Sequence, residues 1–188
     1  MLPRASRKQQ VCKPAARAPH RRLASDERGV TAIEFGLLAP IFFALIGATL
    51  ETGIVFLASE VLDSAVQNST RRILTGQAQE ANMNEAGFRQ LICDGLYGLF
   101  DCDKLKIKVD VVTDFQSATI TPPLDPADPT KWTLVQAFQP GRASEIVRVQ
   151  AYYKWPVIVS LLGFNLATEN DGTRLLGAVR VFKNEPFQ

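Results

Sequence analysis

An uncharged apolar run near the start of the chain constrains the fold more than any other feature of the sequence. Residues 36–50, GLLAPIFFALIGATL, contain no charged side chain, and only Glu34 and Glu51 are charged within residues 30–59. A helix rises about 1.5 Å per residue, so a helix over this range is long enough to cross a hydrocarbon core of roughly 30 Å. The sequence therefore predicts one membrane-spanning helix.

Positive charge is concentrated ahead of the apolar run. Residues 1–28 carry eight basic and two acidic side chains, whereas residues 60–188 carry thirteen basic and fifteen acidic ones. Basic residues beside a membrane segment favour the cytoplasmic side. We therefore expect residues 1–29 to form a basic cytoplasmic leader or tail and the C-terminal part to lie outside. A secretory signal cleaved on the outer side is the alternative.

A basic tail can also bind nucleic acid. This one contains no Phe, Tyr or Trp on which bases would stack, and it adjoins the membrane segment. We expect no nucleic-acid partner.

The predicted helix continues beyond the membrane. Small and apolar residues recur every four positions from residue 61 to residue 73, which is typical of an amphipathic helix. Gly76 is the expected C-cap. The sequence thus predicts a transmembrane and stalk helix over residues 30–76, followed by a separate domain over residues 77–188.

Residues 77–188 combine helical and strand patterns. Asn84 is the expected N-cap of a short helix that runs to about Leu91. Four prolines mark residues 121–129 as a loop. Strands are predicted from alternation or β-forming composition at residues 104–115, 144–155 and 174–183.

The apolar residues 156–164 leave two interpretations open, a helix packed on the sheet or a segment lying against the membrane. In either case the expected fold class is α+β. A long N-terminal transmembrane helix would extend into a small antiparallel-sheet periplasmic domain.

The start of the apolar segment carries a family resemblance. Residues 28–35 read RGVTAIEF, and GLLAPIFFALIGATLETG follows. This stretch resembles the N-terminal signature of the TadE-like family and, more loosely, that of type IV prepilins. In those prepilins a basic leader ends in Gly, and a Glu stands five residues into the mature chain. Here these residues are Gly29 and Glu34, the first mature residue would be Val30, and Phe35 stands where the major Tad pilins usually have Tyr.

The resemblance implies a structural role as a minor pilin or pseudopilin of the Tad (Flp) pilus system. It implies cleavage between Gly29 and Val30 by a prepilin peptidase at the cytoplasmic face of the inner membrane. It also implies that Glu34 pairs with the freed amine of Val30 on a neighbouring subunit, with Phe35 beside it in the assembly interface. The expected partners are the inner membrane, other pilins and the Tad assembly proteins.

The sequence leaves two alternatives open. The chain could be an unprocessed, single-pass membrane-anchored binding or assembly module of the envelope, because TadE-like relatives include unprocessed proteins. The Glu34 carboxylate could also simply reach toward the membrane interface, and the same holds for Glu51 near the outer edge.

Two cysteines in the C-terminal domain form a candidate disulfide. Cys93 and Cys102 are separated by eight residues, and a periplasmic location would be oxidising. The alternative is a pair of buried thiols. Cys12 lies in the leader and should remain reduced. The spacing of the pair is too long for the usual zinc motif, and no histidine lies nearby.

The sequence gives no sign of catalysis. The only histidine is His20, in the leader, so the C-terminal domain lacks the residue needed for Ser-His, Cys-His or His-metal chemistry. No phosphate-binding glycine loop is present. We expect no enzyme activity, no cofactor, no metal and no small-molecule substrate.

Overall fold

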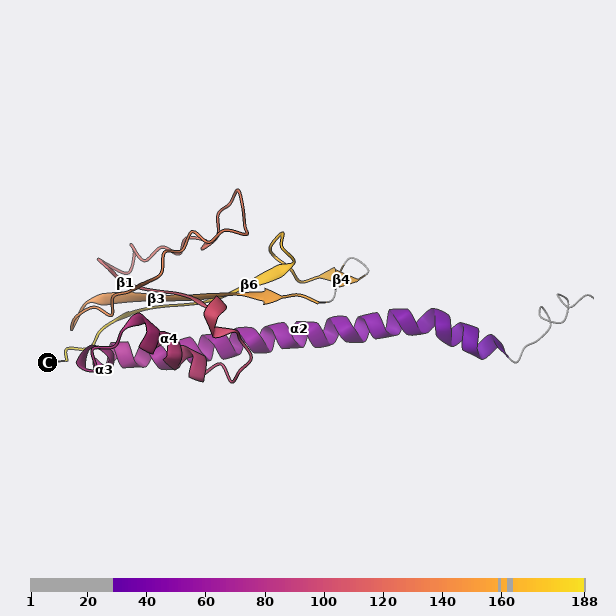
Figure 1. Cartoon of the computed structure of the whole chain (residues 1–188), viewed down its shortest axis with the longest axis horizontal. Helices are drawn as coiled ribbons and strands as arrows, with labels where there is room; N and C mark the ends of the chain where they lie inside the picture. The colour runs from indigo at the N-terminus through magenta and orange to yellow at the C-terminus, as the bar shows by residue number, and fades with distance from the viewer. Residues whose placement is uncertain (1–28, 159, 162–163, 188) are drawn as a thin grey trace, which may run out of the picture. The chain divides into compact units, whose positions relative to one another are not determined.

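The computed structural model describes residues 29–158, 160–161 and 164–187. The chain divides into two compact units, residues 1–43 and 44–188, which are described separately below. In chain order the elements (Figure 1) are α2 (Val30–Leu74), α3 (Gln77–Glu80), α4 (Glu85–Asp94), η2 (Cys102–Lys104), β1 (Lys106–Val112), β2 (Ala137–Phe138), β3 (Ile146–Pro156), β4 (Ser160–Leu161), β5 (Phe164–Asn165) and β6 (Thr173–Lys183).

Helix α2 is 45 residues long, as the apolar run and the amphipathic pattern after it predicted. It stops because Gly76 adopts a left-handed conformation with φ of 84°. The Gly76 N–H donates to the carbonyl of Ile73 at 3.1 Å, which pairs one of the carbonyls left open at the helix end. Gly76 therefore ends the helix as expected.

Within the second unit, one side of α2 is buried against the rest of the domain. The buried positions recur at intervals of three and four residues, the spacing of one helix face. The apolar ones join a single core with side chains from α4 and the sheet. The buried members on α2 are Glu51, Val55, Ala58, Leu62, Ala65, Val66, Ser69, Thr70 and Ile73.

Helix α4 was predicted with its cap. The Asn84 side chain accepts a hydrogen bond from the Gly87 N–H at 2.8 Å, so Asn84 is the N-cap. The helix runs three residues beyond the predicted Leu91, to Asp94. Its Phe88 and Ile92 are fully buried in the core.

The sheet has four strands in the order β2-β1-β3-β6. The three long strands were predicted and are antiparallel, with Val109 opposite Val149 and Gln150 opposite Val179. The two-residue strand β2 was not predicted and pairs with β1 in parallel. The sheet is therefore mixed, and the fold class is α+β as expected.

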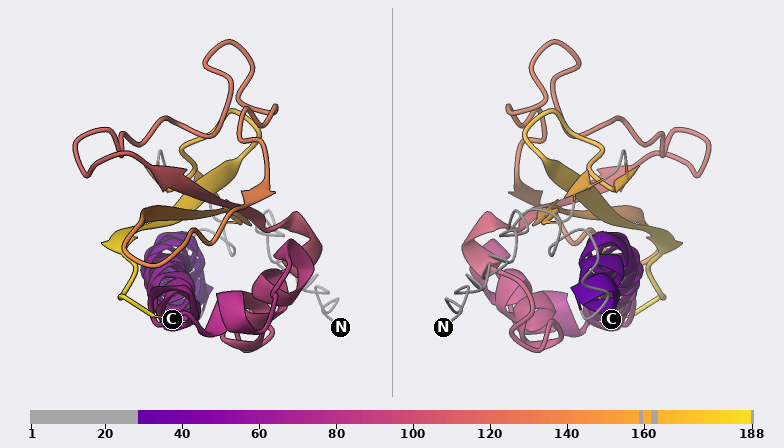
Figure 2. Two further views of the ribbon diagram at one scale, coloured as in Figure 1. Left: turned by 90° about the vertical axis from the view of Figure 1, so that its left-hand side faces the viewer. Right: turned by 90° about the vertical axis from the view of Figure 1, so that its right-hand side faces the viewer.

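The two faces of the sheet are covered differently. Helices α2, α3 and α4 lie on one face, and the segment between β1 and β2, residues 113–136, runs over the other (Figure 2). Gln150 and Tyr152 of β3 point away from the helices' side by strand alternation, yet only 3% and 5% of their surface is exposed. The loop covers them, so β3 is buried on both faces.

The described residues of 156–164 (156–158, 160–161 and 164) do not form the helix that was one of the two expectations. Strand β3 extends to Pro156, and Ser160–Leu161 pairs antiparallel with Phe164–Asn165. Val157 and Ile158 are β-branched, which favours extended backbone over helix. The helix interpretation is therefore wrong.

Candidate functional site

The first turns of α2 bring the family-signature residues together. The helix begins at Val30, directly after Gly29, and a side chain at Gly29 would meet no atom within 4 Å. Glu34 and Phe35 follow about one turn later. Glu34 is exposed, and it forms no ion pair with any described residue.

Large apolar side chains surround these residues on the helix surface. Their exposed fractions lie between 45% and 70% within residues 30–43, values normally found for charged side chains. Such a continuous apolar surface needs lipid or other helices to cover it. Its members are Val30, Ile33, Phe35, Leu37, Leu38, Ile41, Phe42 and Phe43.

The length and composition of α2 agree with that requirement. Among the described residues it is the one helix that is long and apolar enough to cross a membrane. Pro40 lies within it, and a membrane helix tolerates proline where neighbours satisfy the freed carbonyl. The helix therefore suggests a membrane anchor.

Glu51, which the sequence placed near the outer edge of the membrane, is turned into the domain. Its exposed fraction is 7%, and its carboxylate accepts a hydrogen bond from the Ile158 N–H at 2.5 Å. The contact joins α2 to the segment after β3, 107 residues further along the chain. No local pattern could have predicted this partner. The signal that was available is an acidic residue interrupting an apolar helix face.

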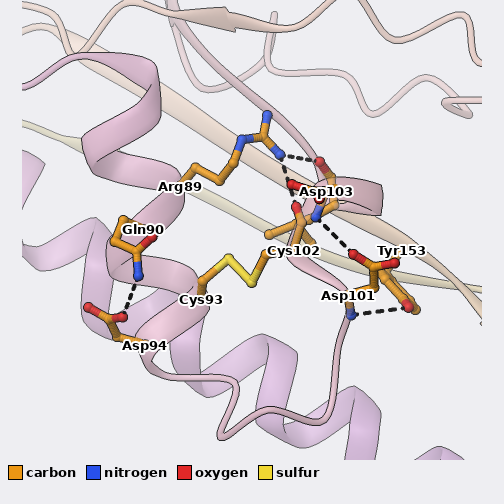
Figure 3. Close-up of a disulfide and its surroundings, with 9 residues drawn as sticks. Arg89, Gln90, Cys93, Asp94, Asp101, Cys102, Asp103 and Tyr153 are labelled. Atoms are coloured by element: carbon orange, nitrogen blue, oxygen red, sulfur yellow. Dashed lines mark hydrogen bonds between the residues drawn. A yellow bond between two sulfur atoms is a disulfide. The ribbon is translucent and has the colours of Figure 1, made fainter.

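The disulfide joins Cys93 to Cys102 as predicted, with their Cα atoms 6.0 Å apart (Figure 3). It ties the last turn of α4 to η2, directly before β1. Arg89 supports the same junction, because its guanidinium donates to the Leu105 carbonyl at 2.5 Å. The Asp101 N–H donates to the Tyr153 hydroxyl at 3.4 Å, which connects this loop to β3.

Two ion pairs that the sequence did not reveal organise the domain around the sheet. Asp63 of α2 binds Arg180 of β6. Arg148 of β3 forms two hydrogen bonds to Asp110 of β1, at 2.5 and 3.1 Å. The hydrogen bond to Asp110 raises the pKa of the Arg148 guanidinium above its ordinary value.

Within the described ranges, no three His, Cys, Asp or Glu side chains cluster closely enough to hold a metal ion. Several hollows lie at the surface of the domain, and the one beside Arg148 lies under the loop that covers the sheet. Chemically, the arrangement offers apolar helix surface, exposed polar loops and charge pairs.

The fold and the exposed helix define a class: an α+β domain built on a helix with the length and composition of a membrane anchor. Residues 29–71, less than a quarter of the chain, match the family model of TadE-like proteins. The match includes Gly29, Val30, Glu34 and Phe35, and it confirms the family that the sequence resembles. Comparisons with curated proteins and with solved structures gave no match.

Proposed function

We propose that this chain is a minor pilin or pseudopilin of the Tad pilus system. One observation carries the proposal: the segment that matches the TadE-like family begins with large apolar side chains that are exposed on the helix among the described residues. A match to this family points to a protein related to the Tad pilus. Uncovered apolar helix surface is suited to packing against lipid and against other pilin helices, and this role requires no catalysis.

Packing between helices in a membrane depends on close approach of their backbones. Gly36, Pro40, Ala44 and Ala48 recur every four residues and therefore follow one side of α2. Small residues at this spacing allow two helices to come close and gain dispersion contacts. The exposed Phe35, Phe42 and Phe43 flank them and would fill the grooves of a neighbouring helix.

Glu34 gives such packing a register. After cleavage behind Gly29, Val30 would carry a charged amine about one helical turn before the Glu34 carboxylate. Neither charge is stable alone in apolar surroundings, so each needs a partner. A neighbouring subunit shifted along the helix axis supplies both partners. Leaving one member of such a buried pair alone would cost roughly 3–5 kcal/mol.

The proposed location is the bacterial inner membrane, with the N-terminus in the cytoplasm and residues 77–188 in the periplasm. The eight basic side chains of residues 1–28 support this orientation. The Cys93–Cys102 disulfide supports it independently, because such bonds persist in oxidising compartments.

The mature N-terminus separates the proposal from its alternative. Mass spectrometry of the protein from native membranes should find a chain that begins at Val30, produced by a prepilin peptidase. A bulky Gly29→Val should block this cleavage. Protein that retains residues 1–29 in native membranes and is absent from assembled pili would instead identify an unprocessed membrane-anchored module.

The role of Glu34 is tested by incorporation into the pilus. Glu34→Gln keeps the side-chain shape and removes the charge, so we expect normal membrane insertion and much reduced co-purification with other pilins. Glu60→Gln is the matched control, because Glu60 lies exposed on the same helix in the second unit. Equal incorporation of the two variants would remove Glu34 from the assembly mechanism.

A further inference from the structure

A second apolar feature lies where the apolar run of α2 ends. Residues 36–50 are uncharged, and Glu51 then accepts the hydrogen bond from the Ile158 N–H. The Ile158 side chain points outward, with 87% of its surface exposed. Residues 156–166 contain no charged side chain. An exposed large aliphatic side chain is thus held at the level of Glu51.

A small hollow lies beside this contact. It has a volume of about 120 Å³ and is formed by one face of α2, by Leu166 and by Arg174 at the start of β6. The Arg174 guanidinium donates to the Leu166 carbonyl at 3.2 Å. Arginine carries five N–H donors, so this bond leaves others for a ligand. The α2 residues that line the hollow are Thr52, Val55, Phe56 and Ser59.

The position of the hollow along α2 determines which part of the bilayer would lie next to it. A helix from Val30 to residue 50 spans about 30 Å, the thickness of the hydrocarbon core. Glu51 then falls at the outer surface of that core. The hollow occupies the next two helical turns, which is the depth of the lipid phosphates.

We propose that Ile158 and the Arg174 hollow form a second membrane contact, in which Ile158 enters the acyl-chain boundary of the outer leaflet and Arg174 binds a phospholipid phosphate. The inference rests on the membrane anchoring proposed above. Arginine pairs with phosphate oxygens through parallel N–H bonds, and apolar side chains next to basic ones are typical of interfacial contacts. Glu51 holds the Ile158 backbone at this depth. The domain would therefore stand on the membrane at two points.

Lipid is favoured over a second copy of the chain as the occupant. Helix α2 tethers Ile158 beside the bilayer, so lipid is present there at high effective concentration whether or not a filament has formed. The combination of one cation with apolar neighbours also matches a phospholipid, which presents a phosphate directly above its acyl chains.

Photocrosslinking of the full chain tests the contact. The protein is placed as single copies in nanodiscs of phosphatidylethanolamine and phosphatidylglycerol, with a photoreactive benzophenone side chain in place of Ile158. Val135, 75% exposed on the loop between β1 and β2, is the aqueous control. We expect at least about ten times more phospholipid adduct at position 158, because burying one large apolar side chain favours docking by that factor or more.

The same photoreactive side chain in place of Leu38, within the apolar run, tests the membrane anchor separately from the second contact at Ile158. Lipid adducts at position 38 with none at 158 would overturn the second contact alone. Their absence at position 38 would overturn the membrane anchor. Adducts from 158 to another protein chain, obtained when several copies share a disc, would assign this surface to a subunit interface and overturn the lipid contact.

The part played by Arg174 is tested in the same assay. Arg174→Gln should reduce the lipid adduct at position 158 about fivefold, as expected for one cation near an anionic membrane surface. Arg174→Lys keeps the charge and should retain most of the adduct, and the exposed Arg142→Gln should have no effect. Unchanged yield with Arg174→Gln in a protein of unaltered circular dichroism would remove the phosphate site.

Discussion

Removing the disulfide should destabilise the C-terminal domain by an amount that follows from the length of the loop it closes. The bond joins Cys93 to Cys102, nine positions apart, and so restricts a loop of about ten residues in the unfolded chain. On the chain-entropy account this restriction contributes ~2.7 kcal/mol to the free energy of unfolding. We expect a loss of this size in the double variant Cys93→Ser, Cys102→Ser.

Other contacts hold the native geometry of this junction when the bond is absent. Arg89 still reaches the Leu105 carbonyl, and the Asp101 N–H still reaches the Tyr153 hydroxyl. The loss should therefore come mainly from the greater freedom of the unfolded chain, and the folded domain should keep its circular dichroism spectrum.

Urea denaturation of the full chain in detergent micelles measures the effect. With an m-value of about 1–3 kcal/mol per M, a loss of ~2.7 kcal/mol lowers the unfolding midpoint by about 1–3 M. Reductant should lower the wild-type midpoint equally and leave the double variant unchanged. Cys12→Ser serves as the control for effects of the leader thiol. Equal midpoints for oxidised and reduced wild type would refute the reasoning.

Two further predictions concern the packing of α2 and the charges of the domain. Leu62→Ala should lower the free energy of unfolding by about 2–5 kcal/mol because it leaves a cavity in the core, whereas Leu57→Ala, at a side chain 55% exposed on the same helix, should change it by less than about 0.5 kcal/mol in detergent. Similar losses in both variants would contradict the assigned buried face. The Lys154 ammonium lies 2.7 Å from the Asp171 carboxylate and holds the pKa of that carboxyl below its ordinary value of 3.8. The ionised carboxylate therefore stabilises the domain at pH values above 3.8, and this stabilisation is lost as the pH falls through the lowered pKa. Asp171→Asn should therefore lower the free energy of unfolding at pH 7 by up to about 1 kcal/mol and have no effect in strong acid. Urea titrations at several pH values measure this, and a loss that is the same at every pH would show that it does not come from the ion pair with Lys154.

The sequence by itself determined the features that arise from local patterns. The uncharged run and the four-residue repeat after it predicted α2, and Gly76 predicted its end. Asn84 marked the start of α4, since an N-cap side chain satisfies backbone donors only three residues away. Alternation or composition indicated the three long strands. The family signature around Glu34 is likewise contained in one short stretch, and residues 29–71 match the TadE-like family.

Only the tertiary structure decided how these elements meet. Strand β2 is two residues long and shows no periodicity of its own, so its parallel pairing with β1 exists only because the loop returns to that edge. For residues 156–164 the sequence left open a helix packed on the sheet or a segment against the membrane, because a short apolar run does not reveal what will pack beside it.

The contacts that position the domain on α2 are the least visible in the sequence. Glu51 finds its donor 107 residues away, and Asp63 finds Arg180 117 residues away. From sequence alone, a carboxylate on a helix is expected to face solvent. Only the folded structure shows that another element brings a hydrogen-bond donor to it. Burial and charge pairing depend on groups that the chain brings together only on folding, whereas helix, strand and cap signals depend on residues already adjacent in sequence.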